Sequence, residues 1–276
     1  MPWRIGWPAG ISMSAYTRPA YLQRNSWLSV LSDADRVAIL RQARVTEFRR
    51  RQRIYHPGSP ANEVYLVESG VVKLAVESSD GREAILGFQH PGDLFGELAV
   101  VDDRPHDHLA EAHESSVVWA IPREVFLGLM HESTALGHEV IKLFGLRLRM
   151  YRTRVYEILH HSAHARVAST LVHLAARHGV EDADGVVIPL RLSQRDIGNL
   201  AGLTRETVNF ILKDLRDRNL IETHGSASGS ETRQCCSTPL TERVVRMVGK
   251  RPGALRAAPG RHPRPVARGV LDYERS

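Results

Sequence analysis

Polar residues in the segment 204–213 have the types and spacing expected of a helix that reads DNA bases. Arg205 can donate two hydrogen bonds to a guanine, and Glu206 can accept one from the amino group of a cytosine. On a helix these side chains lie away from the apolar residues Val208 and Ile211. We therefore predict base contacts from one exposed face, formed by Arg205, Glu206, Asn209 and Lys213.

Two short helices joined at a glycine would hold these residues in place. Ser193 is predicted to cap the first helix, with Asp196 completing a capping box. Gly202 suits the tight turn because glycine adopts a positive φ at little cost, and Thr204 is predicted to cap the second helix. Gly198 is small where the helices must approach each other. The pattern predicts a helix-turn-helix, with phosphate or sugar contacts from Ser193, Gln194 and Thr207.

The overall charge says little about a DNA contact. The net charge is +6, but residues 231–276 alone hold ten Lys/Arg and four Asp/Glu. That surplus of six equals the surplus of the whole chain, 37 Lys/Arg against 31 Asp/Glu. The case for DNA binding must therefore come from particular residues rather than from the isoelectric point.

The cysteine content and the hydropathy of the sequence limit the cellular compartment and the cofactors that we expect. The only cysteines, Cys235 and Cys236, form no disulfide framework, which predicts a reducing cytoplasm. They are too few to hold an iron–sulfur cluster. Because no long apolar run and no secretory signal is present, we expect no contact with a membrane.

The middle of the chain changes from a β-rich to a helical pattern. Short β-rich runs separated by turn signals extend from Val45 to Pro122, which predicts a β-sandwich or barrel. The helical stretch that follows carries an apolar stripe. We predict that this stripe forms a dimer seam, and the alternative is that it packs on its own β-domain. The stripe comprises Leu136, Val140, Leu143, Leu146 or Leu148, Met150 and Val155.

Three segments resemble one protein family. "QRDIGNLAGLTRETVNFILKDLRDRNLI" is similar to the C-terminal helix-turn-helix of the CRP/FNR family of bacterial transcription regulators. "IYHPGSPANEVYLVESGVVKL" and "PGDLFGELAVVDDRP" resemble the cyclic-nucleotide-binding jelly roll of that family. The resemblance covers about Ser32 to Gly225.

The resemblance implies an α+β chain with an N-terminal β jelly roll, a long dimerisation helix and a C-terminal winged-helix-type helix-turn-helix domain. We expect five parts: a loose leader (1–31), a β-roll sensor (32–132), the dimerisation helix (133–162), the DNA-binding domain (163–230) and a disordered basic tail (231–276).

The implied function is that of a cytoplasmic homodimer that binds double-stranded DNA at a palindromic operator. An effector in the β-roll would bias the hinge near His160 to Ala165, and RNA polymerase would be a further partner of an activator. The alternative is a sensor or scaffold that has lost specific DNA binding through its altered tail. We expect no enzymatic activity, because Glu97, His106 and Asp107 follow no catalytic spacing rule.

The expected effector pocket departs from the nucleotide-binding relatives. Where they place an Arg-Ser pair after the "FGE" motif, this chain has His106-Asp107, and an aspartate repels a phosphate. Tyr151-Arg152 falls where smaller residues contact adenine in cAMP-binding relatives. We therefore expect no cAMP binding, although "FGEL" could also serve only to shape a loop. The predicted pocket comprises Gly96, Glu97, Leu98, Arg104, His106, Asp107, Tyr151 and Arg152.

Histidines leave haem open as a cofactor. His106, His108 and His113 belong to the predicted β-roll. His160 and His164 are one turn apart, the spacing of a helical metal pair, but a third ligand is needed. We predict no metal site and treat these histidines as solvated or hinge residues.

Two further departures lie in and after the second helix. Phe210 replaces an arginine of relatives with "RETVxR". Its ring could contact a thymine methyl or tuck into the helix interface. After about Gly225 no clear strand is evident, and the tail resembles an out-of-frame extension. Alternatively, the tail is a basic arm that contacts phosphates.

Overall fold

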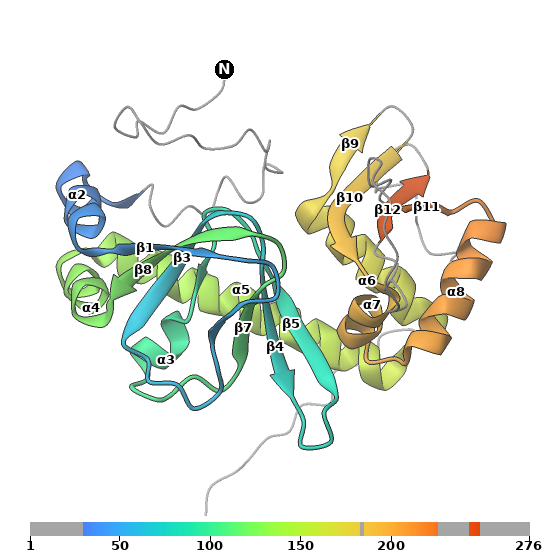
Figure 1. Ribbon diagram of the computed structural model, residues 1–276, viewed down its shortest axis with the longest axis horizontal. Helices are drawn as coiled ribbons and strands as arrows, with labels where there is room; N and C mark the ends of the chain where they lie inside the picture. Colours follow the sequence, from blue (N-terminus) through green and yellow to red (C-terminus); the bar gives the residue numbers. More distant parts are fainter. Residues whose placement is uncertain (1–29, 183–184, 226–242, 249–276) are drawn as a thin grey trace, which may run out of the picture.

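The computed structural model describes residues 30–182, 185–225 and 243–248 (Figure 1). Most of the predicted leader and tail therefore lies outside the described residues. The first helix among the described residues is α2 (Asp33–Gln42), which Ser32 caps through a capping box with Asp35. Ser32 occupies the N-cap position that the sequence predicts.

Eight strands form two four-stranded antiparallel sheets with the strand orders β1-β8-β3-β6 and β2-β7-β4-β5. This arrangement is a jelly roll, as the resemblance implies. The hairpin between β4 and β5 turns at Gly81, whose φ is 76°. The strands are β1 (Arg44–Phe48), β2 (Arg53–Tyr55), β3 (Glu63–Ser69), β4 (Val72–Glu77), β5 (Glu83–Gln89), β6 (Leu94–Phe95), β7 (Leu109–Ala112) and β8 (Ser116–Pro122).

Three helices accompany the roll. A short helix, α3 (Glu97–Val101), follows β6, and α4 (Arg123–Glu132) follows β8. The long helix α5 (Thr134–His160) then runs along the roll and leads to the second domain (Figure 1).

The apolar residues of α5 lie on two different faces. Leu136 and Val140 are buried against the roll, and Leu143 packs beside them. By contrast, Leu148 and Val155 are exposed. The predicted dimer seam is therefore wrong in the residues it includes: Leu136 and Val140, in the first two turns, pack on the chain's own β-domain. A separate exposed stripe consists of Ile141, Leu148, Val155 and Leu159.

The second domain places three helices against a four-stranded sheet. The helices are α6 (Ala163–His178), α7 (Gln194–Ala201) and α8 (Arg205–Asp217). The sheet has the order β11-β12-β10-β9, with strands β9 (Val180–Asp182), β10 (Gly185–Leu192), β11 (Ile221–Gly225) and β12 (Arg243–Val248).

Strand β12 contradicts the prediction of a disordered tail over residues 231–276. Val245 of β12 pairs with Ile188 of β10 on one side and with Thr223 of β11 on the other. Its side chain is buried in the domain core. The sheet of the second domain thus includes residues beyond 230, so the expected loss of a β-wing does not hold.

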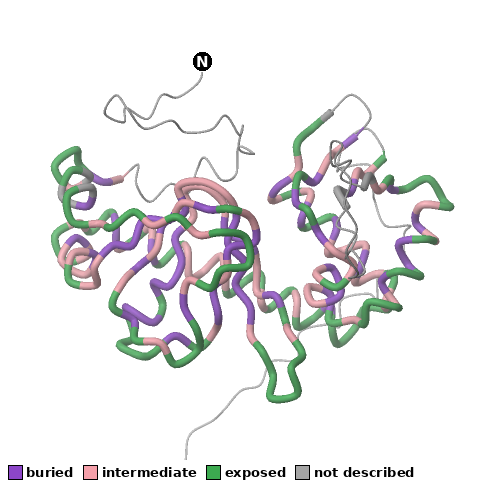
Figure 2. Tube along the Cα trace, viewed as in Figure 1, coloured by how far each residue is buried: buried purple, intermediate pink, exposed green. Residues whose placement is uncertain are grey.

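One apolar cluster joins the two domains. It includes Ile85 and Phe88 of the roll together with Val167, Ile197 and Val208 of the second domain. Figure 2 shows buried segments in both domains and along their junction. This shared core fixes the position of α7 and α8 relative to β5. In the described part of the chain, no helix is long and apolar enough to cross a membrane.

Candidate nucleic-acid interface and sensor pocket

Local rules of helix capping set the geometry of the helix-turn-helix. The Oγ of Ser193 accepts a hydrogen bond from the Asp196 backbone nitrogen at 3.1 Å, and the Asp196 carboxylate accepts one from the Ser193 nitrogen at 2.8 Å. Gly202 ends α7 with φ 65°, and the Oγ1 of Thr204 caps α8 through the Thr207 nitrogen. A Cβ on Gly198 would lie 2.6 Å from the Leu203 carbonyl oxygen. The predicted roles of the caps and glycines are confirmed.

Helix α8 has one buried face and one exposed face. Val208, Ile211 and Leu215 are buried in the core. The exposed residues include those that the sequence predicts to contact bases, namely Arg205, Glu206, Asn209 and Lys213.

The predicted contacts to phosphate or sugar differ in their surroundings. Gln194 of α7 donates to the Oδ1 of Asn209 at 2.8 Å, so the side chains of the two helices meet on this surface. Ser193 instead directs its hydroxyl to Asp196 at 2.7 Å. Thr207 is half-buried, with its Oγ1 3.0 Å from the Oγ1 of Thr204. Gln194 is thus joined to the base-reading face, whereas the Ser193 hydroxyl caps α7 and the Thr207 hydroxyl contacts the capping residue of α8, Thr204.

Phe210 lies on the exposed face of α8. Its side chain is 65% exposed. Its ring meets His164 of α6 edge-on, with 6.1 Å between the ring centroids. The interpretation that Phe210 tucks into the helix interface is therefore wrong. Its apolar ring lies instead on the exposed face of α8, beside polar side chains.

In the expected effector pocket, polar residues are buried against one another. Glu97, the first residue of α3, is fully buried and forms an ion pair with Arg147 of α5. Arg147 also donates to the carbonyl oxygen of Leu94 at 2.5 Å. This guanidinium therefore connects the long helix to the turn that carries the "FGE" motif.

His106 is buried in the same region without a hydrogen-bond partner. Its side chain stacks on Tyr55 at a centroid distance of 3.8 Å, and neither ring nitrogen is hydrogen-bonded to the described residues. Burial, with a smaller contribution from His108, lowers the pKa of His106 to about 4. The ring is therefore neutral at pH 7 and offers no positive charge to a phosphate.

The other predicted pocket residues do not converge on this place. Arg104, Asp107 and Arg152 are exposed, and Leu98 is about half exposed. Asp107 instead accepts from His108 at 2.7 Å, and His108 contacts the Tyr55 hydroxyl at 2.7 Å. Only Gly96, Glu97 and His106 come together. Tyr151 lines a different cavity, between α5 and α6.

Arg147 is the residue that the sequence interpretation missed. It continues the buried positions 136, 140 and 143 of α5 by a further step of four. A charged residue at a buried helical position requires a partner. The sequence therefore indicates that Arg147 needs a partner, but it does not identify Glu97, which is 50 residues away in the chain.

His160 and His164, whose spacing would suit a metal pair on one helix, do not share a helix. Helix α5 ends at His160, and α6 begins at Ala163, so His164 lies in a different helix. No group of three or more His, Cys, Asp or Glu residues in the described part of the chain could hold a metal ion.

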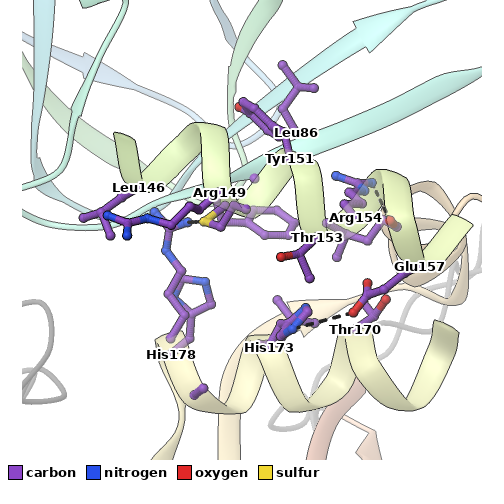
Figure 3. Close-up of a pocket in the computed structure, with 17 residues that line it drawn as sticks. Leu86, Leu146, Arg149, Tyr151, Thr153, Arg154, Glu157, Thr170, His173 and His178 are labelled. Carbon is purple, nitrogen blue, oxygen red and sulfur yellow. Dashed lines mark hydrogen bonds and ion pairs between the residues drawn. The ribbon is translucent and has the colours of Figure 1, made fainter. Parts of the chain in front are cut away.

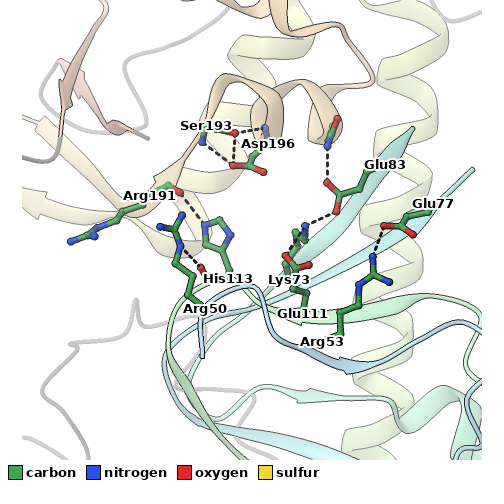
Figure 4. Close-up of polar contacts among 11 residues, drawn as sticks. Arg50, Arg53, Lys73, Glu77, Glu83, Glu111, His113, Arg191, Ser193 and Asp196 are labelled. Atoms are coloured by element: carbon green, nitrogen blue, oxygen red, sulfur yellow. Dashed lines mark hydrogen bonds and ion pairs between the residues drawn. The ribbon is translucent and has the colours of Figure 1, made fainter. Parts of the chain in front are cut away.

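Polar contacts join the roll to the second domain (Figure 4). Lys73 contacts Glu83 at 2.5 Å and Glu111 at 3.2 Å. These carboxylates raise the pKa of Lys73, although burial opposes them. The second carboxylate oxygen of Glu83 accepts from the side-chain nitrogen of Asn199 in α7 at 2.8 Å.

A histidine of the roll makes a further contact across the junction. The Nε2 of His113 lies 3.0 Å from the backbone carbonyl of Arg191, to which it can donate. The junction therefore connects the β4–β5 hairpin and the end of β7 directly to the region that holds the helix-turn-helix.

Comparisons with known proteins agree with this two-domain architecture. A family model described as a cyclic nucleotide-binding domain matches residues 45–133. A model described as a Crp-like helix-turn-helix domain matches residues 165–228.

Full-length relatives are similar over most of their own length. The chain is 27% identical to a CRP-like cAMP-activated global transcriptional regulator of Mycobacterium tuberculosis, covering 69% of this chain and 85% of that protein. It is 31% identical to a global nitrogen regulator of Nostoc sp., covering 65% and 82%. The solved structure of FixK2 from Bradyrhizobium japonicum is 26% identical with a TM-score of 0.62, covering 79% of this chain and 99% of that chain.

Proposed function

The chain belongs to the CRP/FNR family of DNA-binding transcription regulators, and we propose that it acts as a cytoplasmic homodimer on a palindromic operator, without a requirement for cAMP. RNA polymerase would be its partner where it activates transcription. The observation that carries the proposal is the contrast between an exposed set of base-reading side chains on α8 and a sensor pocket without an available cation.

The exposed face of α8 supports specific reading of DNA. Arg205 and Glu206 lie in the first turn of the helix, the part that enters the major groove in this kind of domain. A guanine and a cytosine are the bases that their side chains match. Phe210 offers an apolar surface that fits a thymine methyl. We therefore propose a half-site with a G·C step and a neighbouring thymine.

The exposed stripe of α5 supports a homodimer. Ile141, Leu148 and Val155 follow one another at seven-residue steps, and Leu159 follows four residues later. That is the spacing of a two-stranded coiled coil. Their side chains are between 57% and 70% exposed in the single chain, so a second copy of α5 would cover them.

The sensor pocket supports an effector other than cAMP. Arg147 is already paired with Glu97, and His106 is neutral. A cyclic phosphate would therefore have to displace an existing ion pair or meet an uncharged ring. The names of the relatives include a cAMP-activated regulator and a nitrogen regulator, so family membership does not determine the effector.

Operator selection tests the DNA-reading proposal. The purified chain would be equilibrated with a randomised palindromic duplex pool at fixed salt, and bound duplexes would be sequenced. We expect enrichment of a two-fold symmetric site with half-sites about 34–36 Å apart, one turn of DNA. Enrichment of no sequence over non-specific DNA would contradict the proposal.

The oligomeric state tests the role of the stripe. Val155→Asp should convert a dimer into a monomer, measured by light scattering after size-exclusion chromatography, because it places a charge in the seam. Val180→Asp is the matched control, since Val180 is also exposed but lies on β9. Equal effects of the two substitutions would contradict a dimer seam along α5.

A further inference from the structure

A cavity lies between α5, α6 and β5, where the two domains meet. Its volume is about 560 Å³, within the range of roughly 300–1,000 Å³ that is typical of small-molecule sites. We propose that this cavity binds an organic anion with an apolar body, such as an aromatic or medium-chain carboxylate. The proposal goes beyond the function above, because only Tyr151 of the residues expected to form the effector pocket lines this cavity.

The body of the cavity is apolar. Leu86 and Phe88 come from β5, Leu146 and Met150 from α5, and Leu174 from α6. Such walls favour an apolar ligand because its surface leaves water on binding. Arg149 and His178 lie at one end of the cavity and Arg154 and Glu157 at the other (Figure 3), and this separation would orient the ligand.

One end of the cavity is positively charged. Arg149 forms no ion pair with the described residues, and its exposed side chain reaches this end of the cavity. Arg177 forms a long ion pair with Asp93 at 4.0 Å and donates to the Sδ of Met150 at 3.4 Å, while its buried Nε has no hydrogen-bond partner in the described chain. These guanidinium groups suit a carboxylate or sulfonate.

His178 adds a neutral polar group at the same end. It is 93% buried, and its Nδ1 has no hydrogen-bond partner among the described residues. Burial, together with His90 and Arg177, lowers the pKa of His178 well below its ordinary value. A buried polar atom without a partner is costly, and His178 lines this end of the cavity.

The opposite end carries acceptors and hydroxyl groups. Glu157 is buried, accepts from Ser169 and lies 3.8 Å from His173. Thr153 and Thr170 line the wall beside it (Figure 3). Arg154 also lies at this end, but its guanidinium is already bound to three backbone carbonyl oxygens. The Glu157 carboxylate therefore disfavours a second negative charge here, so a monoanion fits better than a dianion.

The cavity is separate from the other surfaces of α5. Leu146, Thr153 and Glu157 face α6, whereas the exposed stripe that includes Leu148 and Val155 lies on a different side of the helix. The Glu97–Arg147 pair lies on the side that packs against the roll. A dimer formed along the stripe would therefore leave the cavity walls in place.

Ligand binding in the cavity would stabilise the domain arrangement seen here. Arg154 lines the cavity and donates to the carbonyl oxygens of Ile85 in the roll and of Asn199 and Leu200 in α7. A ligand that contacts α5, α6 and β5 together binds only when these elements are assembled, and binding energy then favours that state.

The test uses the full-length protein and the anionic fluorophore 8-anilinonaphthalene-1-sulfonate as the probe, without DNA. We expect saturable binding of one probe per chain, displaced by decanoate at lower concentration than by decanol. Arg149→Ala should weaken binding about tenfold, the effect of losing one charged hydrogen bond. Lys142→Ala is the matched control, because it removes the same charge from α5 two turns away.

Two variants that fill the cavity complete the test. Thr153→Trp on α5 and Ala176→Trp on α6 start from exposed positions and should each abolish probe binding. Circular dichroism would identify a misfolded variant. In that case, probe binding by the other, folded variant tests the proposal. Binding that is not saturable, that survives both tryptophans, or that responds equally to Arg149→Ala and Lys142→Ala would overturn the proposal. None of these outcomes depends on DNA binding.

Discussion

On α8, Arg205, Glu206 and Lys213 extend into solvent. In the sensor pocket, by contrast, Glu97 and His106 are buried, and Arg147 is half-buried in its ion pair with Glu97. The first set can meet DNA without breaking an existing contact. The second set must exchange an ion pair or a ring stack for any ligand that enters. The side chains of the DNA-reading face are therefore available to bind DNA, whereas the side chains of the sensor pocket are occupied by contacts within the chain.

The same contrast separates the effects of substitution. Changes in the buried set should act mainly on the free energy of unfolding, because they remove partners inside the structure. Changes on α8 should act mainly on DNA affinity, because the affected side chains contact little else.

Arg147→Met should reduce the free energy of unfolding by about 3–5 kcal/mol, because it leaves the Glu97 carboxylate buried without its cation. Chemical denaturation measures the loss. The double substitution Glu97→Leu with Arg147→Met should recover most of it, since an apolar pair needs no compensation. A loss below about 1 kcal/mol, the range of surface ion pairs, would show that the pocket is not closed by this contact.

Stability should fall as the pH drops from about 6.5 to 4, because the unfolded chain then protonates His106 while the folded chain does not. The contribution of His106 reaches at most about 3 kcal/mol and levels off below its folded pKa. His113 and His178, whose pKa values are also lowered by burial, act in the same direction. Comparison with His106→Phe isolates the His106 contribution, and identical pH profiles for the two proteins would contradict its buried neutral state.

Arg205→Ala should weaken specific binding by roughly 1–3 kcal/mol for each half-site, the usual value of a bidentate contact to guanine. The free energy of unfolding should change little, because Arg205 is exposed. Arg218→Ala is the control, since Arg218 is also exposed but lies at the far end of α8, near Asp214. Fluorescence anisotropy on the selected operator measures both proteins, and equal losses would mean that Arg205 contributes only charge.

Phe210→Arg should change the preferred base next to the G·C step by about 1 kcal/mol, because a guanidinium can bond a guanine whereas a phenyl ring cannot. The expected shift is from thymine towards guanine at that position. Repeating the operator selection with the variant measures it. An unchanged preference would mean that the exposed ring does not face a base.

The sequence was informative where structure follows from neighbouring residues. Ser193 with Asp196, Gly202 and Thr204 obey local rules of capping and turn geometry, and each occupies its predicted role. The jelly roll followed from the resemblance and from regularly spaced turns. These features need no knowledge of distant contacts.

The sequence was less informative where distant segments meet. Nothing near Arg147 indicates Glu97, and the two faces of α5 depend on which residues the roll covers. Strand β12 was missed because the average composition of the tail concealed six residues, "RVVRMV", that pair with β10 and β11. Phe210 could not be placed because both of its alternatives were locally reasonable.

The most direct test of the account measures fluorescence anisotropy of the purified protein on the selected operator and on non-specific DNA, at fixed salt, with and without cAMP. We expect specific binding that is the same in both conditions, because the closed pocket offers cAMP no available cation. Specific binding only in the presence of cAMP would contradict this account and would mean that the Glu97–Arg147 pair opens to receive the nucleotide.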